Sequence, residues 1–281
     1  MKVVYTEKSQ VLASRTAQAL GCKVAEVKYT TFPDGEQYVR IMDMEDDMVI
    51  VGSTVDAASA TQVMLLLDAC EGRDVTLVLP YMGYARQDKK FNDGEPISAR
   101  AMAKALSEGA SRVFTVNIHD KSVLNHFRCP ATDLSLAPEI GRYIAGRNLG
   151  KTLILSPDVG AWEFAKAVAE PYGLDCDHMD KTRHSGSEVT MAPKHLDAAG
   201  RNCVIVDDII ATGGSVALAA SRLMEQGAAS VSVAGVHGVF ASGGYVKLMN
   251  AGLADIANSD TIERASSKFS AAQIIADAVR K

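Results

Sequence analysis

Two adjacent carboxylates followed by a run of small residues form the strongest chemical pattern in the sequence. Asp207 and Asp208 follow an apolar stretch that ends at Val206, and a small-residue run over 211–215 precedes a helical pattern. Hydroxyls and unobstructed backbone N–H groups at a helix N-terminus suit a phosphate. Carboxylates accept hydrogen bonds from sugar hydroxyls or help to hold a divalent cation. The pattern predicts a sugar-phosphate site; the alternative is a helix-capping turn with solvated acids.

A Lys-x-Arg motif lies in a second polar segment. Lys181 and Arg183 open the stretch 181–188, which contains Gly186 and lies between apolar segments, as a closing lid would. A guanidinium can donate to two phosphoryl oxygens at once, and an ammonium supplies a point charge. The alternative is a pair of solvated loop charges.

Short apolar runs alternate with amphipathic stretches and predict the elements that position these groups. We expect strands at 48–52, 75–79, 112–118, 152–155, 202–206 and 231–235. We expect helices over 59–70, 97–106, 162–169 and 215–226, and another in the tail from Ser270. Apolar strands separated by helices imply an α/β fold with mainly parallel sheets covered on both faces.

The two halves of the chain look related. When Val49–Val51 is set over Val204–Val206, Gly72 falls on Gly227, and each glycine closes a helical pattern. The first copy has Gly-Ser where the second has Asp207-Asp208, so we expect an internal duplication in which only the second copy kept its polar site. This leaves an exposed apolar first half. We expect domains over 1–140 and 141–269, with the helix of 270–281 packing back on the first.

Composition restricts the class of protein. The 281 residues include 29 Lys and Arg against 34 Asp and Glu, so the formal charge is −5, and we expect no nucleic-acid partner. No apolar run reaches the ~20 residues that span a bilayer, so we expect no membrane association. Five scattered cysteines without a Cys-x-x-Cys motif favour a reduced, cytoplasmic location.

Further motifs, taken together with the acidic loop, resemble a known family. The segments are 32–36 (FPDGE), 84–89 (YARQDK), 93–98 (DGEPIS), 117–119 (NIH), 156–158 (SPD) and 181–183 (KTR). In this order they closely resemble the signature of ribose-phosphate pyrophosphokinase, over nearly the whole chain, and the acidic loop is similar to the ribose-phosphate loop of the phosphoribosyltransferase fold. The resemblance implies two phosphoribosyltransferase-like domains that transfer the β,γ-pyrophosphate of ATP to the anomeric hydroxyl of ribose 5-phosphate, leaving AMP.

The resemblance also implies roles for individual residues. ATP would contact Phe32, Asp34, Gly35, Glu36, Arg86 and Gln87. Ribose 5-phosphate would be bound by Arg183, Asp207, Asp208, Ala211, Thr212, Gly213, Gly214 and Ser215. Mg²⁺ would lie at His119 and Asp158, and the catalytic side chains would be Lys181 and Arg183. The family's ATP site is shared between subunits, so the resemblance implies a homo-oligomer.

Several of these residues have structural alternatives. His119 ends an apolar stretch and could be a satisfied core histidine, Asp158 could cap the next helix, and Phe32 could pack in the core. The stretch 86–90 could be a solvated loop. Ala211 departs from the family, because many members carry an aspartate at that position.

One motif is rejected on its context. Residues 145–152 satisfy a loose P-loop pattern, but they follow a predicted helix and precede a predicted strand, which is the reverse of what a P-loop requires. Two other functions remain open. A phosphoribosyltransferase would share the acidic loop, and a non-catalytic regulatory homologue would bind nucleotides without turnover.

Overall fold

The computed structural model describes residues 1–179, 181–183, 189–191 and 196–281, with the two short internal segments described by their backbone alone. The chain forms two compact units. Unit 1 consists of Met1–Ser135, Asp260–Glu263 and Ser270–Lys281, and unit 2 of Leu136–Ser259 and Arg264–Phe269. The chain therefore passes between the units four times. The expected boundary after residue 140 falls inside helix α4 (Ala137–Gly146), which belongs to unit 2.

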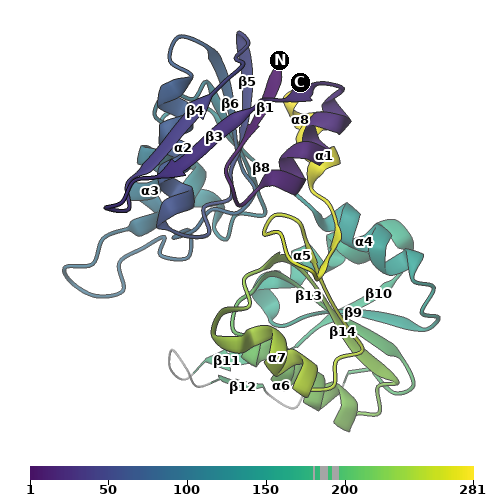
Figure 1. Ribbon diagram of the computed structural model, residues 1–281. Coiled ribbons are helices and arrows are strands. Elements are labelled where there is room, and N and C mark those ends of the chain that lie inside the picture. The colour runs from purple at the N-terminus through teal and green to yellow at the C-terminus, as the bar shows by residue number, and fades with distance from the viewer. Residues whose placement is uncertain (180, 184–188, 192–195) are drawn as a thin grey trace. The chain divides into compact units, whose positions relative to one another are not determined.

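Unit 1 is built on a parallel sheet with helices on both faces (Figure 1). Its strands lie in the order β2 (Lys23–Val24), β1 (Lys2–Tyr5), β5 (Asp47–Val51), β6 (Asp74–Leu79), β7 (Arg112–Val116) and β8 (Ala131–Leu134). The helices are α1 (Gln10–Leu20), α2 (Ala57–Ala69), α3 (Ser98–Leu106) and α8 (Ala272–Val279). Apolar residues of α2 and α3 share one core cluster with the strands, whereas α1 packs against α8.

Unit 2 repeats this architecture. Its parallel strands lie in the order β10 (Asp175–His178), β9 (Thr152–Ser156), β13 (Asn202–Ile210), β14 (Ser230–Gly238), β15 (Asp255–Ser259) and β16 (Ser267–Phe269). Besides α4 its helices are α5 (Trp162–Ala169), α6 (Gly214–Glu225) and α7 (Gly244–Asn250). The α/β fold with two mainly parallel sheets is therefore confirmed. Within the described part of the chain, no helix is both long and apolar enough to cross a membrane.

The two sheets share one plan. Strand for strand, β2-β1-β5-β6-β7-β8 corresponds to β10-β9-β13-β14-β15-β16. In each unit an antiparallel hairpin precedes the third strand of the order: β3 (Val27–Thr31) with β4 (Gln37–Ile41), and β11 (Lys181–Arg183) with β12 (Val189–Met191). Gly72 and Gly227 both take a left-handed φ, near 78° and 83°, where each chain leaves its helix. These correspondences support the duplication read from the sequence.

The last helix of each repeat belongs to the unit that the other repeat forms. Helix α4 follows β8 of the first repeat, yet it packs against α5 in unit 2. Helix α8 follows β16 of the second repeat, yet it packs against α1 in unit 1. Since α1 and α5 hold equivalent places, the repeats exchange equivalent helices.

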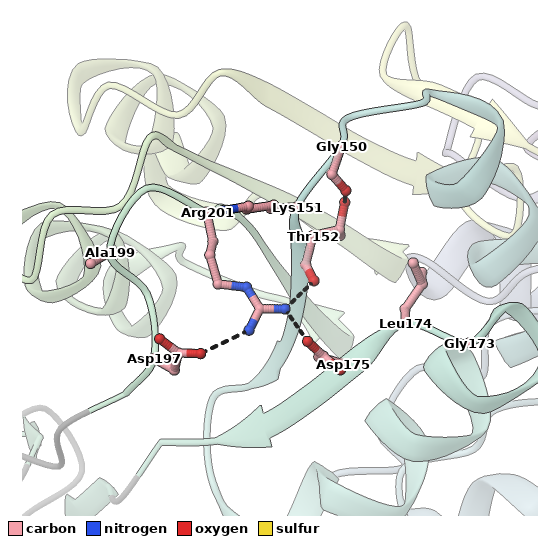
Figure 2. Close-up of a pocket in the computed structure, with 9 residues that line it drawn as sticks. All are labelled: Gly150, Lys151, Thr152, Gly173, Leu174, Asp175, Asp197, Ala199 and Arg201. Atoms are coloured by element: carbon pink, nitrogen blue, oxygen red, sulfur yellow. Dashed lines mark hydrogen bonds and ion pairs between the residues drawn. The ribbon is translucent and has the colours of Figure 1, made fainter.

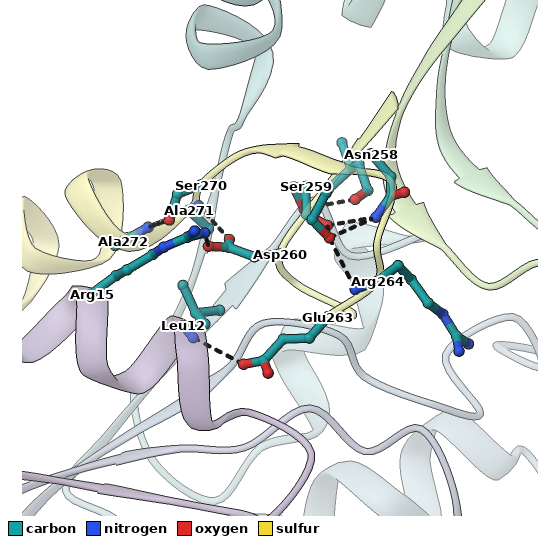
Figure 3. A network of polar contacts seen from close by, with 12 residues as sticks. Leu12, Arg15, Asn258, Ser259, Asp260, Glu263, Arg264, Ser270, Ala271 and Ala272 are labelled. Carbon is teal, nitrogen blue, oxygen red and sulfur yellow. Dashed lines mark hydrogen bonds and ion pairs between the residues drawn. The ribbon is translucent and has the colours of Figure 1, made fainter. Parts of the chain in front are cut away.

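A short segment from the second repeat, Asp260–Glu263, packs beside α1 in unit 1 (Figure 3). It also covers the edge where the lost site would be. The buried Ser53, the counterpart of Asp208, donates its hydroxyl to the carbonyl of Thr261 at 2.5 Å. Glu263 accepts from the amide of Leu12 at the start of α1, at 2.9 Å. The expectation of an exposed apolar first half does not hold at this edge, because the chain covers the edge itself.

Candidate functional site

The acidic pair lies within a strand rather than after one. The sequence predicts that β13 ends at Val206, but the strand continues to Ile210 and pairs with β14, with Asp207 opposite Gly235 and Ile210 opposite Gly238. Pairing with β14 continues at Asp207, Ile209 and Ile210, so the polar side chains do not end the ladder. The carboxylates therefore project from a rigid strand near its carboxyl end, where ligands bind in open α/β sheets.

The charges around Asp207 are unfavourable to its ionised form. Burial raises the pKa of Asp207 well above the ordinary range, and the neighbouring carboxylates of Asp208 and Asp158 raise it further. The amide of Asp208 donates to Asp207 Oδ1 at 3.0 Å, which favours the ionised form without cancelling these effects. A cation, or a ligand that donates hydrogen bonds to Asp207, would therefore stabilise its ionised form.

The small-residue loop after β13 ends in an open helix start. Gly213 is the N-cap of α6 with φ near 72°, and no side chain caps this helix. The first N–H groups of a helix have no partner within it and favour an anion. Thr212 is exposed beside them, whereas Ala211 and Ser215 are half-buried. The reading of 207–215 as a capping turn with solvated acids is thus not what the structure has.

A glycine that the sequence reading missed shapes this loop. A Cβ on Gly213 would lie 2.9 Å from the carbonyl oxygen of Gly244, and one on Gly244 would lie 3.0 Å from that of Ala211. The start of α7 therefore packs directly on the backbone of the loop. The only sequence signal was a second Gly-Gly pair after a predicted strand, which matches Gly213-Gly214.

Asp158 caps the turn that follows it, as its structural alternative predicted. It follows β9, the strand beside β13, and its Oδ1 accepts from the amide of Ala161 at 3.3 Å to cap the short 3₁₀ helix η2 (Val159–Ala161). Its charge also acts on Asp207. Unit 2 therefore brings together Asp158, the acidic pair and the 211–215 loop at the carboxyl edge of one sheet.

The residues expected on the ATP side lie in unit 1. Phe32 is 47% exposed at the tip of the β3–β4 hairpin, edge-on to Tyr38, so it is not part of the core. Asp34 Oδ1 accepts from the amide of Glu36 at 3.2 Å, and Gly35 has φ near 97°. The tip therefore presents its aromatic ring and two carboxylates on a tight, internally bonded turn.

Arg86 and Gln87 follow β6, and Gln87 is fixed by the start of α3. Ser98 donates its hydroxyl to Gln87 Oε1 at 2.6 Å, and the amide of Ala99 donates to the carbonyl of Gln87 at 3.1 Å. Gln87 is half-buried, whereas Arg86 is exposed. This part of the 86–90 stretch is therefore anchored rather than a freely solvated loop.

His119 follows β7 and is exposed, which excludes the reading as a core histidine. The next residue, Asp120, accepts from the amide of Ser122 at 2.7 Å and starts the 3₁₀ helix η1 (Lys121–His126). Hydrogen bonds from Ser122, with a smaller effect of His119, lower the pKa of Asp120.

The Lys-x-Arg motif is described by its backbone only. Lys181 and Arg183 form β11, opposite Met191 and Val189 of β12. Their side chains and the expected lid residues 184–188 lie outside the described residues.

A pocket of about 470 Å³ lies at the other edge of unit 2's sheet (Figure 2). Its lining includes Lys151, Asp175, Asp197 and Arg201 at the amino ends of β9, β10 and β13. Arg201 donates to the carbonyl of Thr152 at 2.7 Å and pairs with both carboxylates, so its charge is already neutralised. The rejected P-loop segment leads from α4 into β9 at this edge, as its context indicated.

Comparisons with known proteins agree with this architecture. The family model for the N-terminal domain of ribose phosphate pyrophosphokinase matches residues 1–109, and that for the phosphoribosyl transferase domain matches residues 135–247. The ribose-phosphate pyrophosphokinase of Methanosarcina acetivorans is 47% identical over 100% of both chains, and that of Methanosarcina mazei is 47% identical over 99% of this chain and 95% of its own. The crystal structure of phosphoribosylpyrophosphate synthetase from Mycobacterium smegmatis has a TM-score of 0.85 at 26% identity, covering 99% of this chain and 97% of the other. The chain belongs to the ribose-phosphate pyrophosphokinase family and is a diphosphotransferase.

Proposed function

We propose that the two units divide between them the binding of the substrates of this family's reaction. The protein transfers the β,γ-pyrophosphate of ATP to the anomeric hydroxyl of ribose 5-phosphate, giving 5-phosphoribosyl 1-pyrophosphate and AMP. Unit 2 binds ribose 5-phosphate: Asp207 and Asp208 accept from the ribose hydroxyls, and the 5-phosphate rests on the N–H groups of 211–215. The observation that carries this assignment is the acidic pair on a rigid strand beside an uncapped helix start.

Cationic and hydrogen-bonding side chains act on the phosphates of ATP. Phosphoryl transfer needs in-line positioning and positive charge where charge builds up on phosphoryl oxygens. We assign this work to Lys181, Arg183 and Arg86, with Gln87 held in place by Ser98. Phe32, with Asp34 to Glu36 beside it, offers an exposed aromatic face to the adenine.

The donor set suits Mg²⁺. Among the described residues, no three His, Cys, Asp or Glu side chains are grouped to hold a metal by themselves. Mg²⁺ prefers oxygen ligands and usually keeps waters and substrate phosphates, so it needs few protein ligands. The support for a cation at this edge of unit 2 is the raised pKa of Asp207 beside two other carboxylates. We assign Asp158 and His119 to the ion, which would neutralise charge on the phosphoryl oxygens.

We further propose a homo-oligomer in which the ATP site is shared between subunits. The support is the exposed Phe32 at a hairpin tip, together with the family resemblance.

The five cysteines are all free, which fits a cytoplasmic location.

The reaction itself is the first test. ATP, Mg²⁺ and ribose 5-phosphate should yield AMP, and omission of either substrate or the cation should abolish it. Lys181→Ala should lower kcat roughly 100- to 1,000-fold, by analogy with the loss of one transition-state donor. Lys151→Ala, at the opposite edge of unit 2's sheet, should leave kcat unchanged. Turnover of phosphoribosyl pyrophosphate with a free base, without AMP release, would instead identify a phosphoribosyltransferase.

Mixing two inactive variants tests the shared site. Phe32→Ala damages the ATP side and Asp207→Asn damages the ribose side. If one subunit completes another's site, mixed oligomers contain some sites with neither change, so activity should return on mixing. A mixture no more active than its components, in oligomers shown to exchange subunits, would contradict sharing.

A further inference from the structure

Hydrogen bonds join the residues just before His119 to the edge strand β8. Asp133 Oδ1 accepts from the amide of Ile118 at 2.9 Å and from the hydroxyl of Thr115 at 2.7 Å. The amide of Asn117 donates to the carbonyl of Leu134, also at 2.9 Å. Both amides that precede His119 are therefore bound to consecutive residues of one strand.

The backbone of this turn needs such support. Asn117 has φ near 43°, in the left-handed region that residues with a side chain adopt rarely, although asparagine adopts it more often than most. A backbone of this kind persists only when its surroundings over-determine it. Ile118 is 8% exposed, so its amide would have no ready replacement for the carboxylate if Asp133 were removed. The turn would then relax, and His119 would move with it.

The other side of the turn is fixed independently. Asp120 accepts from the amide of Ser122 and starts η1, so the chain after His119 has its own anchor. His119 therefore lies between two acidic anchors. Asp133 is the one that accepts from the amide of Ile118, the residue directly before His119.

We propose that Asp133 is a positioning residue that fixes the backbone of Ile118 and thereby places His119 to hold the divalent cation of the ATP complex. This inference rests on the cation role assigned to His119 in the proposed function. Carboxylates that orient a metal ligand commonly act through hydrogen bonds, and their loss costs about 10- to 100-fold in metal affinity. Here the orientation passes through the main chain.

Binding of a Mn²⁺ complex tests this proposal without turnover. The probe is Mn²⁺ with a non-hydrolysable ATP analogue, and its dissociation constant is measured from the relaxation rate of water protons. Asp133→Ala should weaken binding by about tenfold or more. Thr115→Val is the matched control, because it removes the other hydrogen bond to Asp133 Oδ1 and leaves the one from Ile118. Thr115→Val should change the dissociation constant by less than about twofold, although it should lower the melting temperature about as much as Asp133→Ala does. Asp133→Leu, of similar volume, replaces the alanine variant if that variant does not fold.

Two further variants separate the possible results. Asp133→Asn keeps a carbonyl acceptor and should restore binding to within a few-fold of the wild type. His119→Ala should weaken binding at least as much as Asp133→Ala. If His119→Ala weakens binding but the folded Asp133 variants do not, Asp133 is only structural and the proposal fails. If His119→Ala has no effect, the cation role of His119 fails, and the inference fails with it. In that case AMP release still tests the reaction.

Discussion

Asp207 occupies a position that suits a ligand better than it suits the folded chain. Burial and two neighbouring carboxylates raise its pKa, so this carboxyl lowers the stability of the fold at pH values above the one at which the unfolded carboxyl titrates. Functional sites commonly retain such groups at a cost in stability. The sequence indicated these side chains by type and adjacency. It did not indicate their electrostatics, because the contribution of Asp158 comes from a different strand.

Asp207→Asn should therefore stabilise the protein while abolishing most of its activity. The unfolded carboxyl titrates near 3.8, and the folded one at higher pH. Between these values the folded chain binds more protons, so the unfolding free energy of the wild type falls as pH rises. At pH 7 the variant should melt at a higher temperature than the wild type, by about 2–4 °C for each kcal/mol of destabilisation relieved. Near pH 3, where the carboxyl is protonated in both the folded and the unfolded chain, the two proteins should melt at the same temperature. Asp120→Asn, whose carboxyl has a lowered pKa, should shift melting downward at pH 7. A lower melting temperature for Asp207→Asn at pH 7 would contradict this account.

At the scale of elements, the strands that the sequence predicted are those with uninterrupted apolar runs. β5, β6 and β9 appear close to their expected bounds because both of their faces are buried. The β3–β4 hairpin was not predicted, because its residues are mostly partly or fully exposed and include charged side chains. The extension of β13 through the acidic pair was also missed. It depends on a partner strand more than twenty residues later in the chain, which no local pattern reports.

The junction of the phosphate loop with α7 predicts a graded effect of alanine at three glycines. Gly213 combines a φ near 72° with a close approach to Gly244, and Gly243 has a φ near 73° but open space around its Cβ position. Gly244 has an ordinary φ of −53° and only the close approach. Gly243→Ala should therefore cost about 1 kcal/mol with an unchanged KM for ribose 5-phosphate. Gly244→Ala should raise that KM, and Gly213→Ala should do both. Urea denaturation and steady-state kinetics measure the two effects.

At the scale of the whole molecule, unit 1 depends on a segment from the second repeat. Asp260 is 2% exposed and accepts from Arg15 at 2.7 Å and from the amide of Ala271 at 2.9 Å (Figure 3). The duplication in the sequence predicted two similar folds. It did not predict this crossing, because an internal repeat shows what is similar and not which copy a segment packs on.

Asp260→Ala should destabilise the protein by about 2–4 kcal/mol, since it removes two hydrogen bonds to a buried carboxylate. Trp162 is the single tryptophan and lies in unit 2, so its fluorescence reports that unit, whereas circular dichroism reports the whole chain. Because the chain passes between the units four times, both midpoints should fall together in urea. Asp277→Ala, at an exposed ion pair with Arg280, should change them little. A fluorescence midpoint that stays in place while the other falls would show independent unfolding.

The trading of terminal helices bears on how such a chain could have arisen. In a half-length protein with a single repeat, the first helix would lack the helix that packs against it. The last helix would have no partner within its own chain. Two copies would satisfy both needs by lending each other their C-terminal ends, which is a self-complementary dimer. The present polypeptide corresponds to that dimer joined head to tail, with one half free to lose its ligand.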